Sequence, residues 1–166
     1  PPDDLEPNIV SADTPEARQY QSITKEQLRM IVRTAHQHGF CAIAGLNTTL
    51  DPFARILGYA REPDGTEKPM KIPDEYGGGV SGDPLYRIAI QVLQKLVDVM
   101  GEEKCNLAII AGGGIRFPHQ ALAVWQLKAR DQERYIKGIA IYSGMVQAGP
   151  ALVHDILEII MRNAME

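Results

Sequence analysis

The sequence predicts an α/β fold in which parallel strands are each followed by a helix. Strand-like and helix-like patterns alternate along the chain as three βα repeats, or four if the N-terminal segment holds a strand. This order produces a parallel sheet with right-handed crossovers. Small and polar residues cluster where the predicted strands end and the helices begin. Ligands bind at those strand ends in barrels and in open α/β sheets alike.

The composition is that of an ordinary globular protein. The 166 residues, 45% hydrophobic and 23% charged, suffice for one domain with its own core. The net charge of −4 argues against a nucleic-acid binder, which usually carries a basic excess. No apolar run approaches the roughly 18 residues that span a bilayer, so we expect no membrane segment. Histidines, cysteines and acidic residues are not spaced as metal ligands, and we nominate no metal site.

The first predicted helix is marked at both ends. Residues 1–23 before it are rich in Pro, Asp and Glu and form a poorly marked N-terminal segment or strand. Thr24 resembles an N-cap, and Gln27 three residues later completes a capping box. Apolar residues then recur at spacings of three and four, as in an amphipathic helix. Gly39 stands where a helix-ending glycine belongs.

The predicted elements after this helix alternate as the fold requires. An apolar run over 40–46 predicts a strand that ends in Asn47 and Thr48. A polar segment over 50–76 contains a Pro-Asp-Gly turn signal, and we interpret it as an excursion loop and a candidate lid. The later elements are a helix from Asp83 to Gly101, a strand over 107–111, a helix over 118–129, a strand over 139–142 and a final helix opened by Gly149 and Pro150.

The stretch 106–116 carries the main chemical signal of the sequence. Residues 107–111 are apolar without a break, the pattern of a strand buried on both faces. Three glycines, 112–114, follow, and Pro118 suits the first turn of the next helix. Bare backbone N–H groups at a helix start bind anions, most often phosphate. The alternative is a tight βα turn that binds nothing, since the spacing matches neither the P-loop nor GxGxxG.

Four sequence blocks together resemble a known family. They are NTT after a strand, GGGVSGDPL at a helix start, IIAGGGI, and IYSGMVQAGP. In this order and spacing they resemble the C-terminal half of dihydroorotate dehydrogenase, and most closely its membrane-linked, quinone-using class. The resemblance covers residues 24–166 and implies the C-terminal half of a (β/α)8 TIM barrel. It implies an oxidoreductase that uses FMN to oxidise dihydroorotate to orotate in pyrimidine biosynthesis.

The resemblance also implies roles for individual residues. The residues that match the FMN-phosphate site are Gly113, Gly114, Tyr142 and Ser143. Those that match positions beside the flavin are Ser81 and Gly82. Asn47 and Thr48 match an asparagine-threonine pair that hydrogen-bonds the substrate pyrimidine. An amide at position 47 suits this role, because it offers both donors and acceptors to a planar ring with carbonyl and N–H edges.

The sequence departs from the family in several places. The family's general base, a serine in this class, lies in the first half of the barrel, so we nominate no catalytic residue in this chain. The segment before Thr24 lacks the lysine expected near the flavin. Leu46 stands where a hydroxyl residue usually precedes Asn-Thr, and the loop at 50–76 is longer than expected. A non-catalytic scaffold or interaction subunit is therefore one alternative, and another FMN barrel oxidoreductase is a second.

The length of the chain predicts a partner. A full barrel needs roughly 250 residues, whereas this chain has 166. Half a barrel exposes two sheet edges and an apolar inner face to water. We therefore expect a missing N-terminal half, a second copy or another subunit to cover it. By resemblance alone, a eukaryotic source would imply a mitochondrial location.

Overall fold

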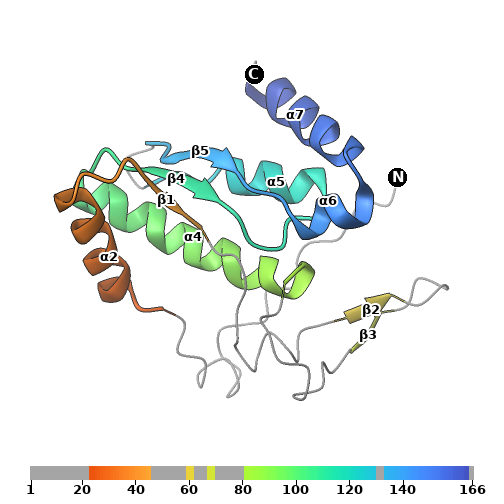
Figure 1. The fold of residues 1–166 in the computed structure, drawn as a ribbon, viewed down its shortest axis with the longest axis horizontal. Coiled ribbons are helices and arrows are strands. Elements are labelled where there is room, and N and C mark those ends of the chain that lie inside the picture. The colour runs from red at the N-terminus through yellow and green to blue at the C-terminus, as the bar shows by residue number, and fades with distance from the viewer. Residues whose placement is uncertain (1–22, 46–58, 62–66, 70–80, 130–132, 165–166) are drawn as a thin grey trace.

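The main sheet consists of three parallel strands that neighbour one another in chain order. The structure is a computed structural model that describes residues 23–45, 59–61, 67–69, 81–129 and 133–164. Its strands β1 (Ala42–Ala44), β4 (Ala108–Ala111) and β5 (Ile136–Ile139) pair in the order β1-β4-β5 (Figure 1). A sheet that adds each new strand beside the last is typical of a barrel wall, whereas doubly wound sheets reverse their order.

The described part of the chain contains five helices beside this three-stranded sheet. They are α2 (Lys25–Gln37), α4 (Asp83–Glu103), α5 (Pro118–Trp125), α6 (Ser143–Ala148) and α7 (Ala151–Ala164). Helix α4 precedes β4 and α5 joins β4 to β5, so the predicted βα alternation is confirmed. The predicted excursion loop at 50–76 contains a hairpin of β2 (Tyr59–Arg61) and β3 (Glu67–Pro69), which pair antiparallel. The N-terminal segment 1–22 lies outside the described residues.

Both ends of α2 follow the predicted capping chemistry. The Gln27 backbone N–H donates to the Thr24 hydroxyl at 3.2 Å, and the Thr24 N–H donates to the Gln27 side-chain oxygen at 2.8 Å. These bonds satisfy two of the amides that a helix start leaves unpaired. At the other end Gly39 has φ +71°, a conformation that disfavours residues with a Cβ.

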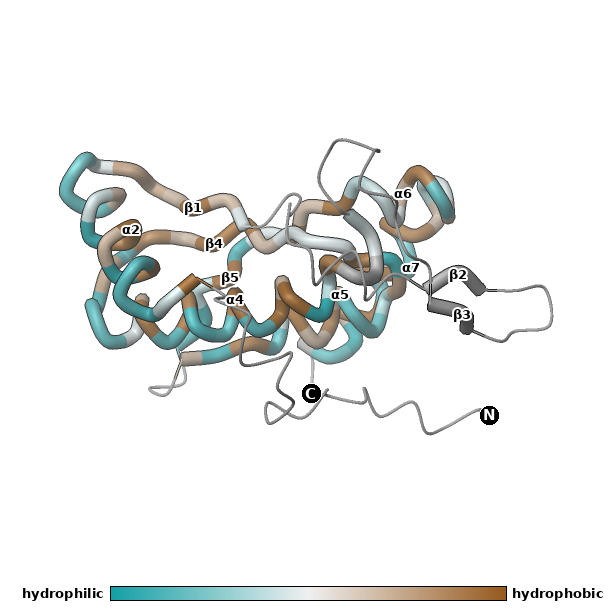
Figure 2. The backbone as a smooth tube through the Cα atoms, turned by 90° about the horizontal axis from the view of Figure 1, so that it is seen from below, coloured by the Kyte–Doolittle hydropathy of each residue, from teal (hydrophilic) through white to brown (hydrophobic). Residues whose placement is uncertain are grey.

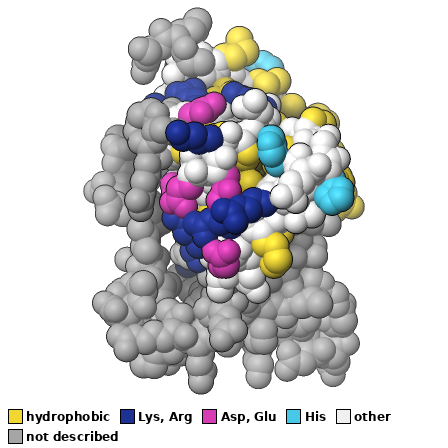
Figure 3. Space-filling view, turned by 90° about the vertical axis from the view of Figure 1, so that its left-hand side faces the viewer, with side chains coloured by type: hydrophobic (Ala, Val, Ile, Leu, Met, Phe, Trp, Pro, Cys, Tyr) yellow, Lys and Arg dark blue, Asp and Glu magenta, His cyan; other side chains and the backbone are white. Residues whose placement is uncertain are grey.

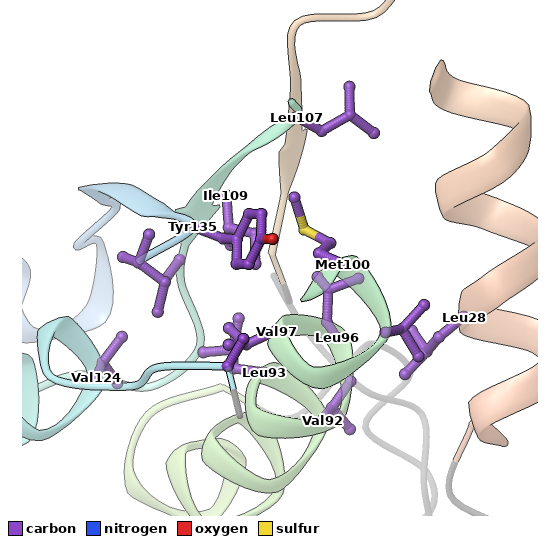
Figure 4. Close-up of a cluster of buried hydrophobic side chains, with 14 of the residues drawn as sticks. Leu28, Val92, Leu93, Leu96, Val97, Met100, Leu107, Ile109, Val124 and Tyr135 are labelled. Atoms are coloured by element: carbon purple, nitrogen blue, oxygen red, sulfur yellow. The ribbon is translucent and has the colours of Figure 1, made fainter. Parts of the chain in front are cut away.

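The core lies between one face of the sheet and the helices. On β4, Ile109 and Ala111 are fully buried, whereas Ile110 between them is 43% exposed. Successive strand residues point to opposite faces, so the helices cover the face of Ile109. Figure 4 shows this cluster, with Leu28 of α2 pointing at α4 and Tyr135 beside Ile109. The prediction that this strand is buried on both faces is wrong for the described chain, because no described element covers the second face.

The hydropathy of the backbone follows the same division. Figure 2 shows apolar residues along β4 and an alternation of apolar and polar residues around α4. In α4, the residues Leu93, Val97 and Met100 are each at most 1% exposed. Burial of such side chains contributes about 1.5–3 kcal/mol each relative to exposure. Helix α4 is therefore the main apolar support of the sheet.

Charged side chains join α2 to the end of α4 at the surface. Arg33 bonds Glu103 at 2.8 Å, Arg29 reaches both Glu102 and Glu103 at 3.0 Å, and Lys25 bonds Glu102 at 2.5 Å. Figure 3 shows basic and acidic side chains interleaved on this end of the molecule. The hydrogen bond from Arg33 lowers the pKa of the Glu103 carboxyl, and that from Lys25 lowers the pKa of Glu102. Helix α4 continues past Gly101, the predicted end, to Glu103, because Lys104 and not Gly101 takes the left-handed conformation that ends the helix, with φ 49°.

The last strand begins three residues earlier than predicted. The apolar run at 139–142 indicated a strand, but β5 spans Ile136–Ile139. The cause is that backbone pairing does not depend on side-chain polarity. Ile109 N–H bonds the Tyr135 carbonyl at 2.8 Å, and the polar Lys137 simply faces solvent within the strand. The pairing continues only as far as Ala140, whose N–H bonds Ala111 at 2.7 Å.

The helices after β4 also differ from the sequence prediction. Helix α5 ends at Trp125 and not near Ala129, and the short helix α6 was not predicted at all. Gly149, with φ +75°, separates α6 from α7, so the final helix starts at Ala151. A six-residue helix has too few apolar positions to show a period in the sequence.

Replacement of Thr24 by alanine tests the α2 cap. Thr24→Ala is expected to lower the free energy of unfolding by about 1 kcal/mol, because it removes the acceptor for the Gln27 amide. Urea unfolding followed by circular dichroism measures the change. Thr34→Ala, on the same helix and also exposed, is the matched control and should be neutral or slightly stabilising. Equal effects of both variants would contradict a capping role.

Acid pH tests the ion pairs between α2 and α4. Because the pKa of Glu103 is lower when folded, its contribution is present above the ordinary value of 4.5 and is lost as the pH falls below it. Glu103→Gln should therefore lower the free energy of unfolding near pH 7 and flatten its decline below about pH 4.5. The deficit should shrink in 1 M salt, which screens exposed charges. A deficit that is unchanged by salt would show that packing and not charge was lost.

Candidate functional site

A cavity of about 440 Å³ opens at the carboxyl ends of the three parallel strands. Its walls are the end of β1 at Ala44 and Gly45, the glycine turn at 112–115, the segment 140–143 after β5, and Ser81 before α4. These segments are distant in the sequence and meet because parallel strands end at the same edge of a sheet. The predicted juxtaposition of the strand ends after β4 and β5 is therefore present.

Glycines let the walls of this cavity approach each other at backbone distance. A Cβ on Gly114 would lie 1.9 Å from the carbonyl oxygen of Gly82, and one on Gly144 would lie 2.3 Å from that of Ile115. A Cβ on Gly45 would lie 3.0 Å from the Gly112 nitrogen. A larger residue at 114 would push the glycine turn away from the start of α4, and one at 144 would push α6 away from the segment at 115–116.

The glycine turn also presents unused backbone donors. Within the described part of the chain, no hydrogen bond engages the N–H of Gly113 or Gly114. Both residues have positive φ, 116° and 74°, which only glycine adopts readily. Residues in such conformations aim consecutive N–H groups into one concavity, where an anion binds. The first-turn amides of α6, which starts at Ser143 on the same cavity, add further donors.

The hydroxyl groups of the cavity complete this neutral donor set. The Ser143 hydroxyl donates to the Ser81 hydroxyl at 3.2 Å, which links two segments 62 residues apart. Tyr142 lies at the rim and is 76% exposed. None of the described residues that line the cavity carries a charged side chain. A bound anion would therefore be held by N–H and O–H groups and not by an ion pair.

The predicted site residues are brought together only in part. Ser81, Gly113, Gly114, Tyr142 and Ser143 all line the cavity. Gly82 is buried, has φ +75° and is not part of the cavity lining. Its carbonyl oxygen accepts hydrogen bonds from the first backbone N–H groups of α4. The predicted substrate residues, Asn47 and Thr48, lie outside the described residues, so their assignment stays a prediction.

Several lining residues were missed by sequence reasoning. They come from the strands and the segments after them, and they are Ala44, Gly45, Ile110, Ile115, Ala140 and Ile141. A glycine inside a strand pattern often marks a close backbone approach, so Gly45 could have been found. Ile110 carried no such signal, because its exposure depends on what covers the second face of the sheet.

A second hollow, of about 410 Å³, lies at the other edge of the sheet. Its lining is apolar and includes Met30, Ile31 and Phe40 from α2 and the segment after it, beside the free edge of β1. These three side chains are 44–63% exposed. Apart from the Thr34 hydroxyl, the described residues of its lining are apolar and include no acid or base, so we interpret it as an uncovered packing surface.

Two other classes of site are not found among the described residues. No group of three or more histidine, cysteine or acidic residues there could hold a metal ion. None of the described helices is both long and apolar enough to cross a membrane.

Comparison with known proteins gives a consistent relationship. A quinone-type dihydroorotate dehydrogenase of Coxiella burnetii (strain Dugway 5J108-111) is 30% identical over 139 residues, which are 83% of this chain and 33% of that protein. One from Prochlorococcus marinus (strain MIT 9313) is 32% identical over 134 residues, 77% of this chain and 29% of that protein. No protein-family model matches the chain. The chain is related to the quinone-type dihydroorotate dehydrogenases. It spans about a third of the length of these relatives.

Solved structures show the same partial fold. The ligand-free DHODH of Eimeria tenella matches with a TM-score of 0.61 at 20% identity, covering 87% of this chain and 34% of that one. The same protein in complex with ferulenol matches with a TM-score of 0.57, over 86% and 32%. The three-stranded α/β unit therefore corresponds to part of the DHODH fold.

The glycine turn can be tested by adding one methyl group. Gly114→Ala should lower the free energy of unfolding by about 3 kcal/mol or more, because the new Cβ meets the Gly82 carbonyl and φ is positive. Gly39→Ala is the matched control, since its φ is +71° but nothing lies within 4 Å of the new Cβ. It should cost only about 1 kcal/mol. Thermal and urea unfolding measure both, and equal losses would contradict the close approach.

Proposed function

We propose that the chain binds the phosphate of FMN and forms the C-terminal half of a dihydroorotate dehydrogenase-like barrel. The observation that carries the proposal is a group of uncharged hydrogen-bond donors at the strand ends, which we call the cradle. It is formed by the glycine turn after β4 and the start of α6 after β5. In (β/α)8 barrels, phosphate sites are usually built from the loops after the last two strands. The cradle has the composition expected of such a site.

The residues of the cavity fit a phosphate group. Backbone amides of Gly113 and Gly114 and the first turn of α6 would donate to its oxygens. The Ser81 and Ser143 hydroxyls, 3.2 Å apart, would add two more donors. A volume of about 440 Å³ lies in the ordinary range for cofactor sites. The absence of carboxylates from the described lining avoids repulsion of a dianion.

The chemistry would be shared between this chain and what lies beyond it. When bound, FMN supplies the acceptor for the hydride of dihydroorotate. The residues of this chain would hold and orient the cofactor at the strand ends. Asn47 and Thr48, which follow Gly45 of the cavity wall, would hydrogen-bond the pyrimidine. A general base would come from the other half of the barrel, because the chain offers none at the matching positions.

Two exposed apolar surfaces support a covering partner. One edge carries the apolar hollow beside β1. At the other end, Val153, Leu157 and Met161 form an exposed stripe on α7 at i, i+4 and i+8. Both surfaces are typical of helix packing in a barrel wall. We propose that the remaining part of the barrel covers them, supplied by further sequence, a second copy or another subunit.

A flavin titration tests the proposed function. The 166-residue chain should bind FMN at least about tenfold more tightly than riboflavin, because only FMN presents a phosphate to the cradle. Quenching of flavin fluorescence measures both affinities. Ser143→Ala should weaken FMN several-fold and leave riboflavin unchanged, with Thr34→Ala as a control outside the cavity. Absence of binding at excess FMN would overturn the flavin proposal and favour the non-catalytic scaffold.

A second titration separates the proposed substrate from that of other FMN barrels. Added orotate should perturb the spectrum of the FMN-loaded protein once the covering half is present, whereas other planar acids should not. Perturbation by unrelated planar acids alone would favour another FMN oxidoreductase. The discriminating residues would be Asn47 and Thr48.

A further inference from the structure

A buried glutamine side chain holds the segment between the glycine turn and α5. Gln120 is only 6% exposed and is the one polar or charged side chain buried in the described part of the chain. Its side-chain oxygen Oε1 accepts the backbone N–H of Arg116 at 2.8 Å and that of Phe117 at 3.2 Å. Neither N–H has a backbone acceptor among the described residues. The conformation of this segment therefore depends on a side chain of the helix that follows it.

The same segment touches both halves of the cradle. It continues directly from Gly114 of the glycine turn, and the start of α6 packs on its backbone. A Cβ on Gly144 would lie 3.0 Å from the Cα of Arg116 and closer still to the carbonyl oxygen of Ile115. A shift of the backbone at 115–116 would therefore move the donors of the turn relative to those of α6.

A second contact joins this glutamine to the start of α4. The Tyr86 hydroxyl donates to the backbone carbonyl oxygen of Gln120 at 3.4 Å. The backbone nitrogen of Tyr86 lies 2.6 Å from the position that a Cβ on Gly114 would take. The glycine turn and the segment after it are therefore supported by the first turns of two helices, α4 and α5.

We propose that Gln120 is a positioning residue for the phosphate site, because it holds the backbone at 116–117 and so sets the spacing between the donors of the glycine turn and those of α6. This inference rests on the proposed function and extends it from the groups that touch the phosphate to the group that places them. Gln120 does not line the cavity, so it acts through the backbone and not by contact with the ligand. Donors that are fixed before binding give an anion higher affinity, because less ordering is needed.

Removal of the Gln120 side-chain oxygen tests this role. Gln120→Met keeps the length of the side chain but leaves two N–H groups without their acceptor. It should weaken FMN binding about threefold to tenfold and leave riboflavin within about twofold, because only FMN depends on the spacing of the cradle donors. The affinity for inorganic phosphate, measured by competition against FMN, should fall by a similar factor. The ratio of the FMN and riboflavin affinities is the readout, since a general loss of stability lowers both alike.

Three further variants separate positioning from folding. Gln120→Glu retains an acceptor oxygen at the same place and should recover most of the lost ratio. Tyr86→Phe removes the hydroxyl bound to Gln120, should lower the ratio about twofold, and guards against poor folding of the methionine variant. Gln94→Met is the matched control, because the Gln94 side chain bonds Asp98 and the Lys128 carbonyl at 3.1 and 3.2 Å, outside the cavity lining. It should lower the free energy of unfolding and leave the ratio unchanged.

The outcomes distinguish this inference from the proposed function. A lower ratio in Gln120→Met, with recovery in Gln120→Glu, supports the positioning role. An unchanged ratio in folded Gln120→Met protein, or in Tyr86→Phe where the methionine variant does not fold, overturns the role and leaves the cradle intact. A fall of equal size in Gln120→Glu or in Gln94→Met also overturns it, because the lost acceptor would not be the cause. Failure of the unmodified chain to bind FMN overturns the proposed function, and this inference with it.

Discussion

The backbone contact between Gly114 and Gly82 is the constraint on which the site depends. The Gly82 carbonyl accepts the first amide bonds of α4, from Leu85 and Tyr86, at 3.0 and 3.2 Å. The glycine turn after β4 therefore packs directly on the start of the helix that supports the sheet. This contact fixes the unused donors of the turn relative to Ser81, one residue before Gly82. A preorganised set of donors binds an anion with little cost of ordering.

The sheet is supported by helices on one side only. Buried side chains of α4, among them Leu93, Val97 and Met100, pack under the sheet face that the helices cover, whereas Ile110 on the other face is exposed. The two outer strands also keep free edges in the described part of the chain. A structure of this kind corresponds to an arc of a barrel, in agreement with relatives three times its length.

Prediction from sequence was most successful where the signal is local. The capping box of Thr24 and Gln27, the positive φ of Gly39 and the strand-to-glycine turn at 108–114 all follow from residues a few positions apart. The parallel order of strands follows from the alternation itself. Prediction was least successful at β5, where Lys137 interrupts an apolar run yet lies inside the strand, and at α6, which is too short to show a period.

The sequence by itself determined the α/β class, the parallel order and the residue types of the cradle, because capping, turn conformation and strand alternation depend on neighbouring residues. Only the tertiary structure decided that Ser81 meets Ser143, that Gly114 approaches Gly82, and that Ile110 borders the cavity. These contacts depend on strand register and on which sheet face the helices cover. Both are set by packing between distant segments, which no local pattern encodes.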